Sequence, residues 1–177
     1  MWYSRTMRPI KPFYFLAVLM LAFGLSGCII VAGGLQISNA SFATSYWDGN
    51  ASNPTYYICD NKTTLVGYTF RYNDPTLLEG WDSYLRGLAS GGIAGSVSFN
   101  ANDPRNDTTS RTVSVTYNVP AGTAPLRATP QTINITPTPV PSPSVIGRTY
   151  VEVRVRSTTG ATRTLTFGPA LVIDNCP

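Results

Sequence analysis

The chain has 177 residues, a formal net charge of +4 and no histidine. Without histidine, the Ser-His-Asp and Cys-His catalytic arrangements are excluded, and the commonest side-chain ligand of transition metals is missing. Three of the 13 basic residues lie within the first eleven positions, which leaves ten basic residues against nine acidic ones in the rest of the chain. This balance does not favour nucleic-acid binding, which depends on clustered lysines and arginines.

The N-terminal segment has the order of a secretory leader. A basic region with Arg5, Arg8 and Lys11 precedes an apolar run over positions 13–23. The run is followed by Leu25-Ser26-Gly27-Cys28, whose small residues suit the groove of a signal peptidase. Such a pattern exports a protein from the cytoplasm.

The motif Leu25-Ser26-Gly27-Cys28 resembles the end of a bacterial lipoprotein signal, in which Leu and two small residues precede the lipidated Cys. The resemblance covers only the first 28 residues. It implies that residues 1–27 are a signal peptide and that Cys28 becomes the first residue of the mature protein. Acyl chains such as palmitate on Cys28 would then anchor the protein to a membrane, since two or three chains hold stably where one is marginal. The implied location is the bacterial cell envelope, at an outer membrane or the cell surface.

Two other interpretations of the leader stay open. Apolar residues continue after Cys28, so positions 13–35 form an uncharged stretch long enough to span a bilayer as an uncleaved helix. A simple signal cleaved near Gly33-Gly34 is the second option. In the lipoprotein interpretation, residues 28–45 are the lipidated N-terminus and a tether, and residues 46–177 are one domain.

The two remaining cysteines, Cys59 and Cys176, predict a disulfide, because an exported chain with one such pair most simply joins them. Cys59 ends the apolar run Tyr56–Cys59, and Cys176 follows the apolar residues 171–173. The bond would join an early strand to the last strand. Two buried free thiols are the alternative.

Alternation of apolar and polar residues predicts that the domain is all-β. The clearest strands are Val66–Tyr72, Val113–Val119 and Val151–Val155, each with apolar side chains on one face. Shorter candidates cover residues 35–42, 56–59, 93–99, 132–136, 164–167 and 170–174. Seven to nine strands predict a two-sheet antiparallel β-sandwich, for which an immunoglobulin-like order is one option.

One segment favours a short helix. Asp74-Pro75 is typical of a helix start, and the helix would end near Gly91-Gly92. We expect it to cover one end of the sandwich with Trp81 in the core, although Gly80 and Gly87 lower its helix propensity. The apolar residues at helical spacing are Leu77, Leu78, Trp81, Leu85 and Leu88.

The proline-rich segment 136–143 predicts an extended edge or crossover, because alternate prolines remove hydrogen-bond donors and exclude a central strand. After it, Tyr150–Phe167 predicts a hairpin that turns at Thr158-Thr159-Gly160 and closes the fold.

Aromatic residues are concentrated in one part of the chain, where ten of the 14 that follow Cys28 lie between Phe42 and Tyr84. One interpretation is that a sheet has an aromatic core. The other is a ligand surface, because Tyr and Trp are favoured in recognition patches and stack on sugar rings. Trp47 is expected to be the most exposed of the residues that would form this surface, which are Tyr46, Trp47, Tyr56 and Trp81.

The acidic clusters have simpler explanations than a catalytic or metal site. Asp74, Glu79 and Asp82 lie close in sequence, and a glycosidase needs two positioned carboxyl groups, but their spacing favours a solvated face with a helix cap. The Asn- and Asp-rich run 100–107 offers oxygen ligands for calcium, although local turns also explain it.

The last predicted hairpin carries a group of arginines. These side chains would either meet anionic headgroups or acidic glycans, or solubilise an outer face and protect an edge strand from pairing. The group comprises Arg148, Arg154, Arg156 and Arg163.

These features predict a membrane-anchored envelope lipoprotein whose sandwich is a non-catalytic interaction or structural module. Its expected partners are the membrane, through the lipid anchor, and envelope proteins or glycans. We expect no cofactor, metal or nucleic acid. The alternatives are a carbohydrate-binding module that uses the aromatic cluster and, less favoured, a carboxylate-based glycosidase.

Overall fold

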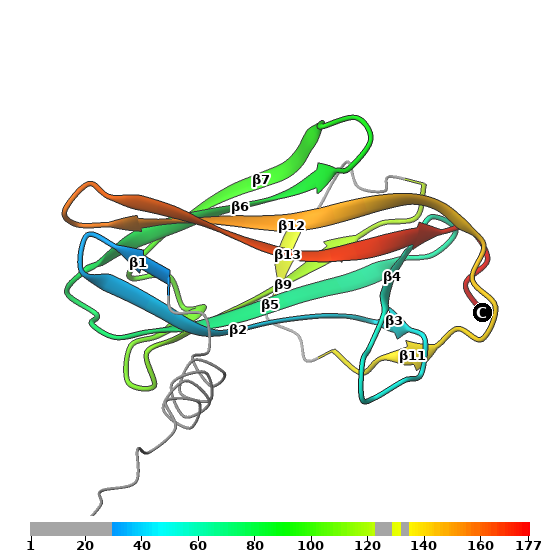
Figure 1. Ribbon diagram of the computed structural model, residues 1–177, viewed down its shortest axis with the longest axis horizontal. Coiled ribbons are helices and arrows are strands. Elements are labelled where there is room, and N and C mark those ends of the chain that lie inside the picture. Colours follow the sequence, from blue (N-terminus) through cyan, green and yellow to red (C-terminus); the bar gives the residue numbers. More distant parts are fainter. Residues whose placement is uncertain (1–29, 123–128, 132–134) are drawn as a thin grey trace, which may run out of the picture.

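The computed structural model describes residues 30–122, 129–131 and 135–177, and within these ranges all regular elements are β-strands. They form two sheets that pack face to face (Figure 1). The first sheet contains β1 (Ile30–Ala32), β2 (Leu35–Thr44), β5 (Thr64–Tyr72), β9 (Thr112–Val119) and β10 (Thr129–Gln131) in that order, with β8 (Asn106–Asp107) paired to β9. The second sheet contains, in order, β11 (Thr138–Pro139), β3 (Tyr46–Trp47), β4 (Tyr56–Cys59), β13 (Thr162–Ile173), β12 (Val145–Ser157), β6 (Leu78–Gly87) and β7 (Ile93–Asn100). The predicted β-sandwich is confirmed.

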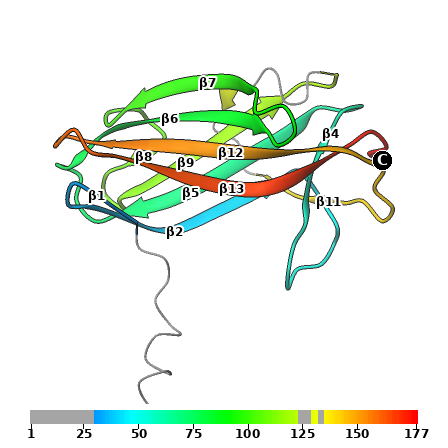
Figure 2. The same cartoon turned by 45° about the horizontal axis from the view of Figure 1, so that its top comes forward.

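The strand order is that of an immunoglobulin-like sandwich. Strands β2, β5 and β9 take the places of strands A, B and E, and β13, β12, β6 and β7 take those of G, F, C and C′. Figure 2 shows the second sheet, with β7, β6, β12 and β13 side by side in that order, in front of β9 and β5 of the first sheet. After β2 the chain changes sheets, and β4 pairs in parallel with β13.

The core fills the space between the sheets. Alternating inward residues of β5 and β9 are buried, as the period-two pattern predicts. Trp81 lies at its centre with no exposed surface, stacked on Phe99 at 5.0 Å between ring centroids. The indole N–H of Trp81 donates a hydrogen bond of 3.0 Å to the hydroxyl of Tyr68.

The predicted helix after Asp74 is wrong. Residues 78–87 form β6, and Asp74 instead closes a turn by accepting the backbone N–H and the hydroxyl of Thr76 at 2.8 and 2.7 Å. The register between β6 and β12 shifts near Gly80. Leu78 and Trp81 are therefore both buried although they are three positions apart, which strict alternation would not allow. Ser83 points into the core between Trp81 and Leu85, but it is polar. The buried apolar residues Leu78, Trp81 and Leu85 are therefore three and four positions apart, which is the spacing of a helix.

The predicted tether over residues 28–45 is also wrong from Ile30 onward. Residues 30–32 and 35–44 form the β1–β2 hairpin, and Leu35 and Ile37 are buried in the core. The sandwich therefore already includes β1 and β2 and does not begin at position 46. The expected strand over 35–42 is confirmed as part of β2.

The later segments largely follow the sequence pattern. In the proline-rich segment, Thr138–Pro139 is the edge strand β11, paired in parallel with β3. Strands β12 and β13 form the predicted closing hairpin, and β13 runs through the bend at Gly168-Pro169, whose peptide bond is cis. Of the candidate strand over 132–136, residues 132–134 lie outside the described residues.

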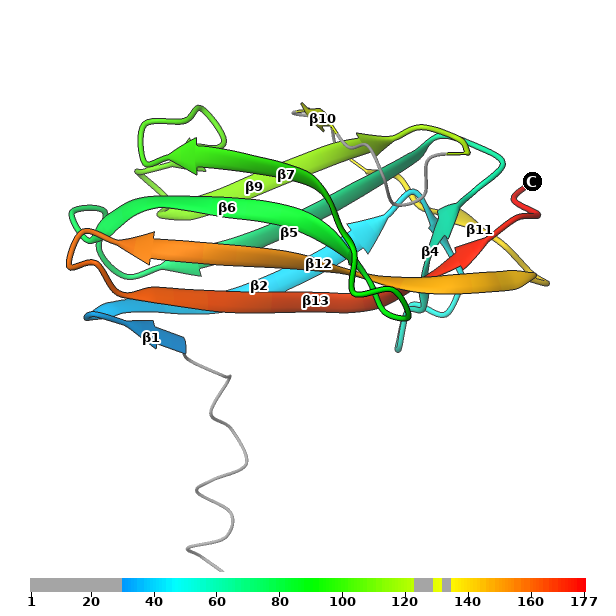
Figure 3. The same cartoon turned by 90° about the horizontal axis from the view of Figure 1, so that it is seen from above.

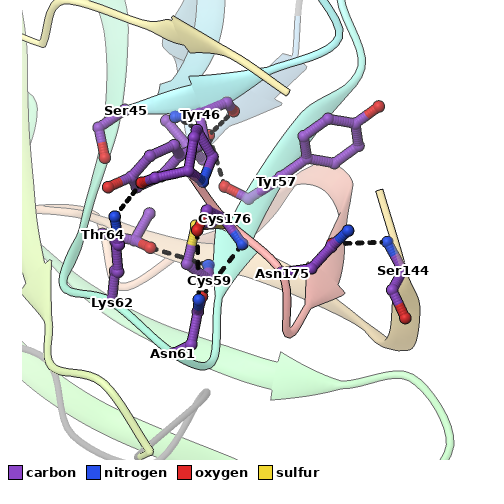
Figure 4. The surroundings of a disulfide bond; sticks show 12 residues. Ser45, Tyr46, Tyr57, Cys59, Asn61, Lys62, Thr64, Ser144, Asn175 and Cys176 are labelled. Atoms are coloured by element: carbon purple, nitrogen blue, oxygen red, sulfur yellow. Dashed lines mark hydrogen bonds between the residues drawn. A yellow bond between two sulfur atoms is a disulfide. The ribbon is translucent and has the colours of Figure 1, made fainter. Parts of the chain in front are cut away.

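The disulfide between Cys59 and Cys176 is present, with a Cα–Cα distance of 5.9 Å (Figure 4). It lies in a second small core with Tyr57, Val140 and Ile173. Asn61 reinforces it, since its side chain accepts the N–H of Cys176 at 3.2 Å and donates to the carbonyl of Cys176 at 3.3 Å. The last residues are thereby fastened to the end of β4.

Candidate functional site

The hairpin of β3 and β4 carries a hollow of about 320 Å³ beside the bend of β13. The two sheets meet here, because β2 from the first sheet lies next to β4 and β13 from the second. Figure 3 shows β4, β11 and the C-terminus at one end of the sandwich and β1 at the other. We call this hollow the distal hollow, and it is lined by Phe42, Pro54, Thr55, Tyr56, Gly168 and Pro169.

Aromatic rings form its floor. The ring of Tyr56 meets that of Phe42 edge-on at 5.5 Å, and Phe42 stacks with Phe167 at 6.4 Å. Phe167 in turn stacks with buried Tyr68 at 5.6 Å. The floor is therefore continuous with the core. Phe42 and Tyr56 keep part of their surface in solvent, so the hollow can accept an apolar group or the face of a sugar ring.

The loop between β3 and β4 is held by its own side chains. The carboxylate of Asp48 accepts the backbone N–H of Asn50 at 3.0 Å, and the Asn50 side chain accepts that of Ser52 at 3.1 Å. The hydrogen bond from the backbone of Asn50 lowers the pKa of Asp48, which is partly exposed. The loop next to the distal hollow thus carries a fixed negative charge at neutral pH.

The structure separates the four predicted ligand residues. Tyr46, Trp47 and Tyr56 lie together on the β3–β4 hairpin and are partly buried, so Trp47 is not an exposed loop residue. Trp81 does not belong to this surface, because it is fully buried in the core. Most of the aromatic concentration is core packing, since Tyr57, Tyr68, Phe70, Tyr72 and Trp81 are all buried.

The three carboxylates considered for a glycosidase are engaged elsewhere. Asp82 binds the guanidinium of Arg156 at 2.5 Å and the hydroxyl of Ser98 at 2.6 Å, and Glu79 lies 3.9 Å from the same guanidinium. Burial by itself would raise the pKa of Asp82, but the bonds from Arg156 and Ser98 outweigh it and lower that pKa. A carboxyl held ionised in this way is poorly suited to donate a proton to a leaving group.

The run 100–107 forms turns of the kind that Asn and Asp favour. The side chain of Asn100 accepts the N–H of Asn102 at 2.9 Å, and Asp103 accepts the N–H of Arg105 at 2.9 Å. Asn106 is buried and accepts the hydroxyl of Tyr72 at 2.7 Å. Within the part of the chain that the structure covers, no group of three or more Cys, Asp or Glu side chains has the arrangement to hold a metal ion.

A second hollow of about 180 Å³ lies at the β1 end, on the outer face of the first sheet. Its lining is polar and contains two arginines that the sequence analysis did not single out. They are 40 positions apart, and the pairing of β5 with β9 brings them together because Arg71 pairs with Thr112, the neighbour of Arg111. We call it the proximal hollow, and its lining residues are Gln36, Ser38, Arg71, Tyr72, Asn73 and Arg111.

Cys28 and the rest of the leader lie outside the described residues. Among the residues that are described, none belongs to a helix long and apolar enough to cross a membrane. Because Ile30–Ala32 and Leu35 are strand residues, a spanning helix that reaches position 35 does not agree with this fold.

The comparisons with known proteins are sparse. No protein-family model matches the chain, and no curated protein matches it. Among solved structures, a Niemann-Pick type C2 protein from the Japanese carpenter ant is similar, with a TM-score of 0.38 and 12% sequence identity. The match covers 85% of this chain and 99% of that one. A likeness this weak carries no argument about function.

Proposed function

We propose that this chain is a membrane-anchored lipoprotein of the bacterial cell envelope, with a sandwich that acts as a non-catalytic interaction module. The observation that carries the proposal is Leu25-Ser26-Gly27-Cys28 at the end of an export leader. The disulfide supports it, because such bonds persist in compartments outside the cytoplasm. The chemistry of the carboxylates agrees with a non-catalytic role, since Asp82 and Glu79 both pair with Arg156.

Exposed apolar side chains support a partner at the distal end. Among the described residues, four large apolar side chains have about half of their surface exposed, and they lie on the β6–β7 turn and at the start of β12. The backbone N–H of Leu88 bonds to the carbonyl of Arg148, so the two segments are neighbours. Grouped apolar residues on a surface mark interaction sites. The four are Leu88 (48%), Ile93 (55%), Val145 (48%) and Ile146 (54%).

The first test is the intact mass of the protein purified from its own membranes, with and without reduction. We expect a chain that begins at Cys28, carries added acyl mass and gains two hydrogens on reduction. Cys28→Ala is the matched control, because it removes the acceptor and leaves the domain unchanged. A full-length mass, or an unmodified Cys28, would end the lipoprotein proposal.

A carbohydrate ligand is the second candidate function, and the aromatic floor of the distal hollow favours it. Sugars stack on rings such as that of Tyr56, and Trp47 on the same hairpin provides a fluorescent reporter. Titration with cell-wall or capsular glycans should change the fluorescence of the wild type but not of Tyr56→Ala. Tyr84→Ala is the matched control, because Tyr84 lies on β6 and does not line the distal hollow. An equal response in all three proteins would exclude the distal hollow as the sugar site.

A further inference from the structure

The proximal hollow has the chemistry of an anion site. Its lining offers the guanidinium groups of Arg71 and Arg111, the hydroxyl of Ser38 and the side-chain amide of Gln36, and it contains no carboxylate. Both arginines are exposed to solvent. Two planar guanidinium groups beside a hydroxyl match the oxygens of a phosphate, which arginine binds through paired N–H groups.

Each of the two arginines donates a hydrogen bond to a backbone carbonyl, which positions its side chain. Most of its N–H donors remain available to a ligand. Arg111 donates to the carbonyl of Asn73 at 2.9 Å, and Arg71 donates to that of Ser110 at 3.4 Å. Each guanidinium has five N–H donors. Among the described residues, neither Arg71 nor Arg111 forms an ion pair within 4.0 Å, whereas Arg86, Arg105 and Arg156 do.

Two carboxylates lie close to this region without lining the hollow. Asp74 acts electrostatically on Arg111, and its oxygen accepts bonds from Thr76. Asp107 binds Ser110 and Thr109 in its own turn. Both are engaged by turn residues, so they do not cap the guanidinium groups.

The backbone at Arg111 is unusual. Its φ is +54°, in the left-handed region that glycine and asparagine occupy at lower cost than arginine. Residues in such conformations gather at functional sites, where the surrounding structure maintains them. Arginine therefore occupies a position where glycine or asparagine would have a lower conformational cost.

The position of the hollow indicates its ligand. Ser38 follows Ile37, and Ile37 pairs with Ile30 at the start of β1. Ile30 is two positions after Cys28, and an extended chain spans at most about 7 Å over two positions. A lipid on Cys28 would therefore lie beside the end of the molecule that carries the β1–β2 hairpin (Figure 1).

We propose that the proximal hollow binds the phosphate of an anionic phospholipid headgroup in the bilayer that holds the anchor, which rests on the proposed lipidation of Cys28. Arg71 and Arg111 bind the phosphate oxygens, and Ser38 donates a further hydrogen bond. This second attachment point fixes the orientation of the sandwich on the membrane. The distal hollow then faces away from the bilayer.

The test measures how fast phenylglyoxal modifies individual arginines, read by peptide mass spectrometry. The acylated protein is reconstituted in vesicles of phosphatidylcholine, with or without phosphatidylglycerol. Modification of Arg71 and Arg111 should slow by about fivefold for each headgroup contact in the anionic vesicles. Arg148, exposed near the distal end, should not change. Equal rates in both vesicles, or equal slowing of Arg148, would overturn the proposal.

A further arm separates the lipid from free phosphate. Glycerol phosphate in solution is added to the neutral vesicles, and protection equal to that by anionic lipid would show a site for soluble phosphate and overturn the headgroup assignment. If the intact mass lacks acyl groups, the proposed lipid anchor is wrong, but the proposed headgroup site is not yet contradicted. The same protein added to preformed vesicles still tests the hollow, because headgroup protection does not require the anchor.

Arg111→Asn tests whether the arginine serves binding or folding. Asparagine tolerates the left-handed backbone, so we expect an unchanged or higher Tm together with loss of the protection at Arg71. Arg148→Gln removes the same charge elsewhere and should leave that protection intact. A lower Tm for Arg111→Asn with protection of Arg71 retained would show that Arg111 is structural.

Discussion

Removal of the disulfide should be among the most destabilising changes in this protein. Cys59 and Cys176 are 117 positions apart, and closing a loop of that length restricts the unfolded chain by about 5 kcal/mol in the chain-entropy model. Domains of this kind are typically stable by about 5–15 kcal/mol, so the loss is a large share of the total. Alanine is the better replacement, because both sulfurs are buried and a serine hydroxyl would need a partner.

The assay is urea unfolding of the membrane-purified protein in non-ionic micelles, followed by tryptophan fluorescence. Buried Trp81 reports the loss of the core. For Cys59→Ala/Cys176→Ala we expect a lower midpoint and a steeper dependence on urea, because the unfolded chain without the cross-link exposes more surface. Reduced wild type should follow the same curve. A loss below about 1 kcal/mol would refute the reasoning and mean that strand pairing alone holds the C-terminal end.

Three further changes test the packing and the charges. Gly80→Ala should destabilise by about 1–3 kcal/mol in urea unfolding, because a Cβ at Gly80 would overlap the carbonyl of Phe99 on β7. Burial raises the pKa of Tyr68 and of Tyr117, so the folded state keeps these protons and stability should fall above about pH 10. Tyr68→Phe should reduce that slope by about 1.4 kcal/mol per pH unit, which is the share of one tyrosine. Arg156→Gln should cost about 1–2 kcal/mol at neutral pH. Since the pKa of Asp82 is lowered in the fold, this cost should disappear as the pH falls from about 4 through that lowered pKa.

Much of the fold follows from period-two alternation, because each main strand has one face in the core and one in water. Strand β9 shows this directly, since Val113, Val115, Tyr117 and Val119 are buried. The disulfide was predictable from cysteine count and export. The same local reasoning failed at β6, where a register shift near Gly80 and the inward Ser83 break the alternation. Only the pairing of β6 with β12 and β7 reveals it as a strand.

The candidate sites were less predictable than the strands. Aromatic residues serve both cores and recognition surfaces, so composition could not separate buried Trp81 from partly exposed Tyr56. The proximal hollow had no local signal at all. Arg71 is one polar residue in an alternating strand, and Arg111 follows a polar turn. Their proximity exists only because β5 and β9 pair in this register.

The short connection between Cys28 and β1 changes how the whole module would work. A long tether would let the sandwich tumble above the membrane, so that no face would be distinguished from another. With Ile30 already in β1, an anchor on Cys28 would restrain one end directly. Strand β12 has 13 residues and runs along the sandwich, which corresponds to roughly 40 Å at the usual rise per residue. The distal hollow and the exposed apolar residues would then be presented at a defined height above the bilayer, which suits a partner that is itself fixed in the envelope.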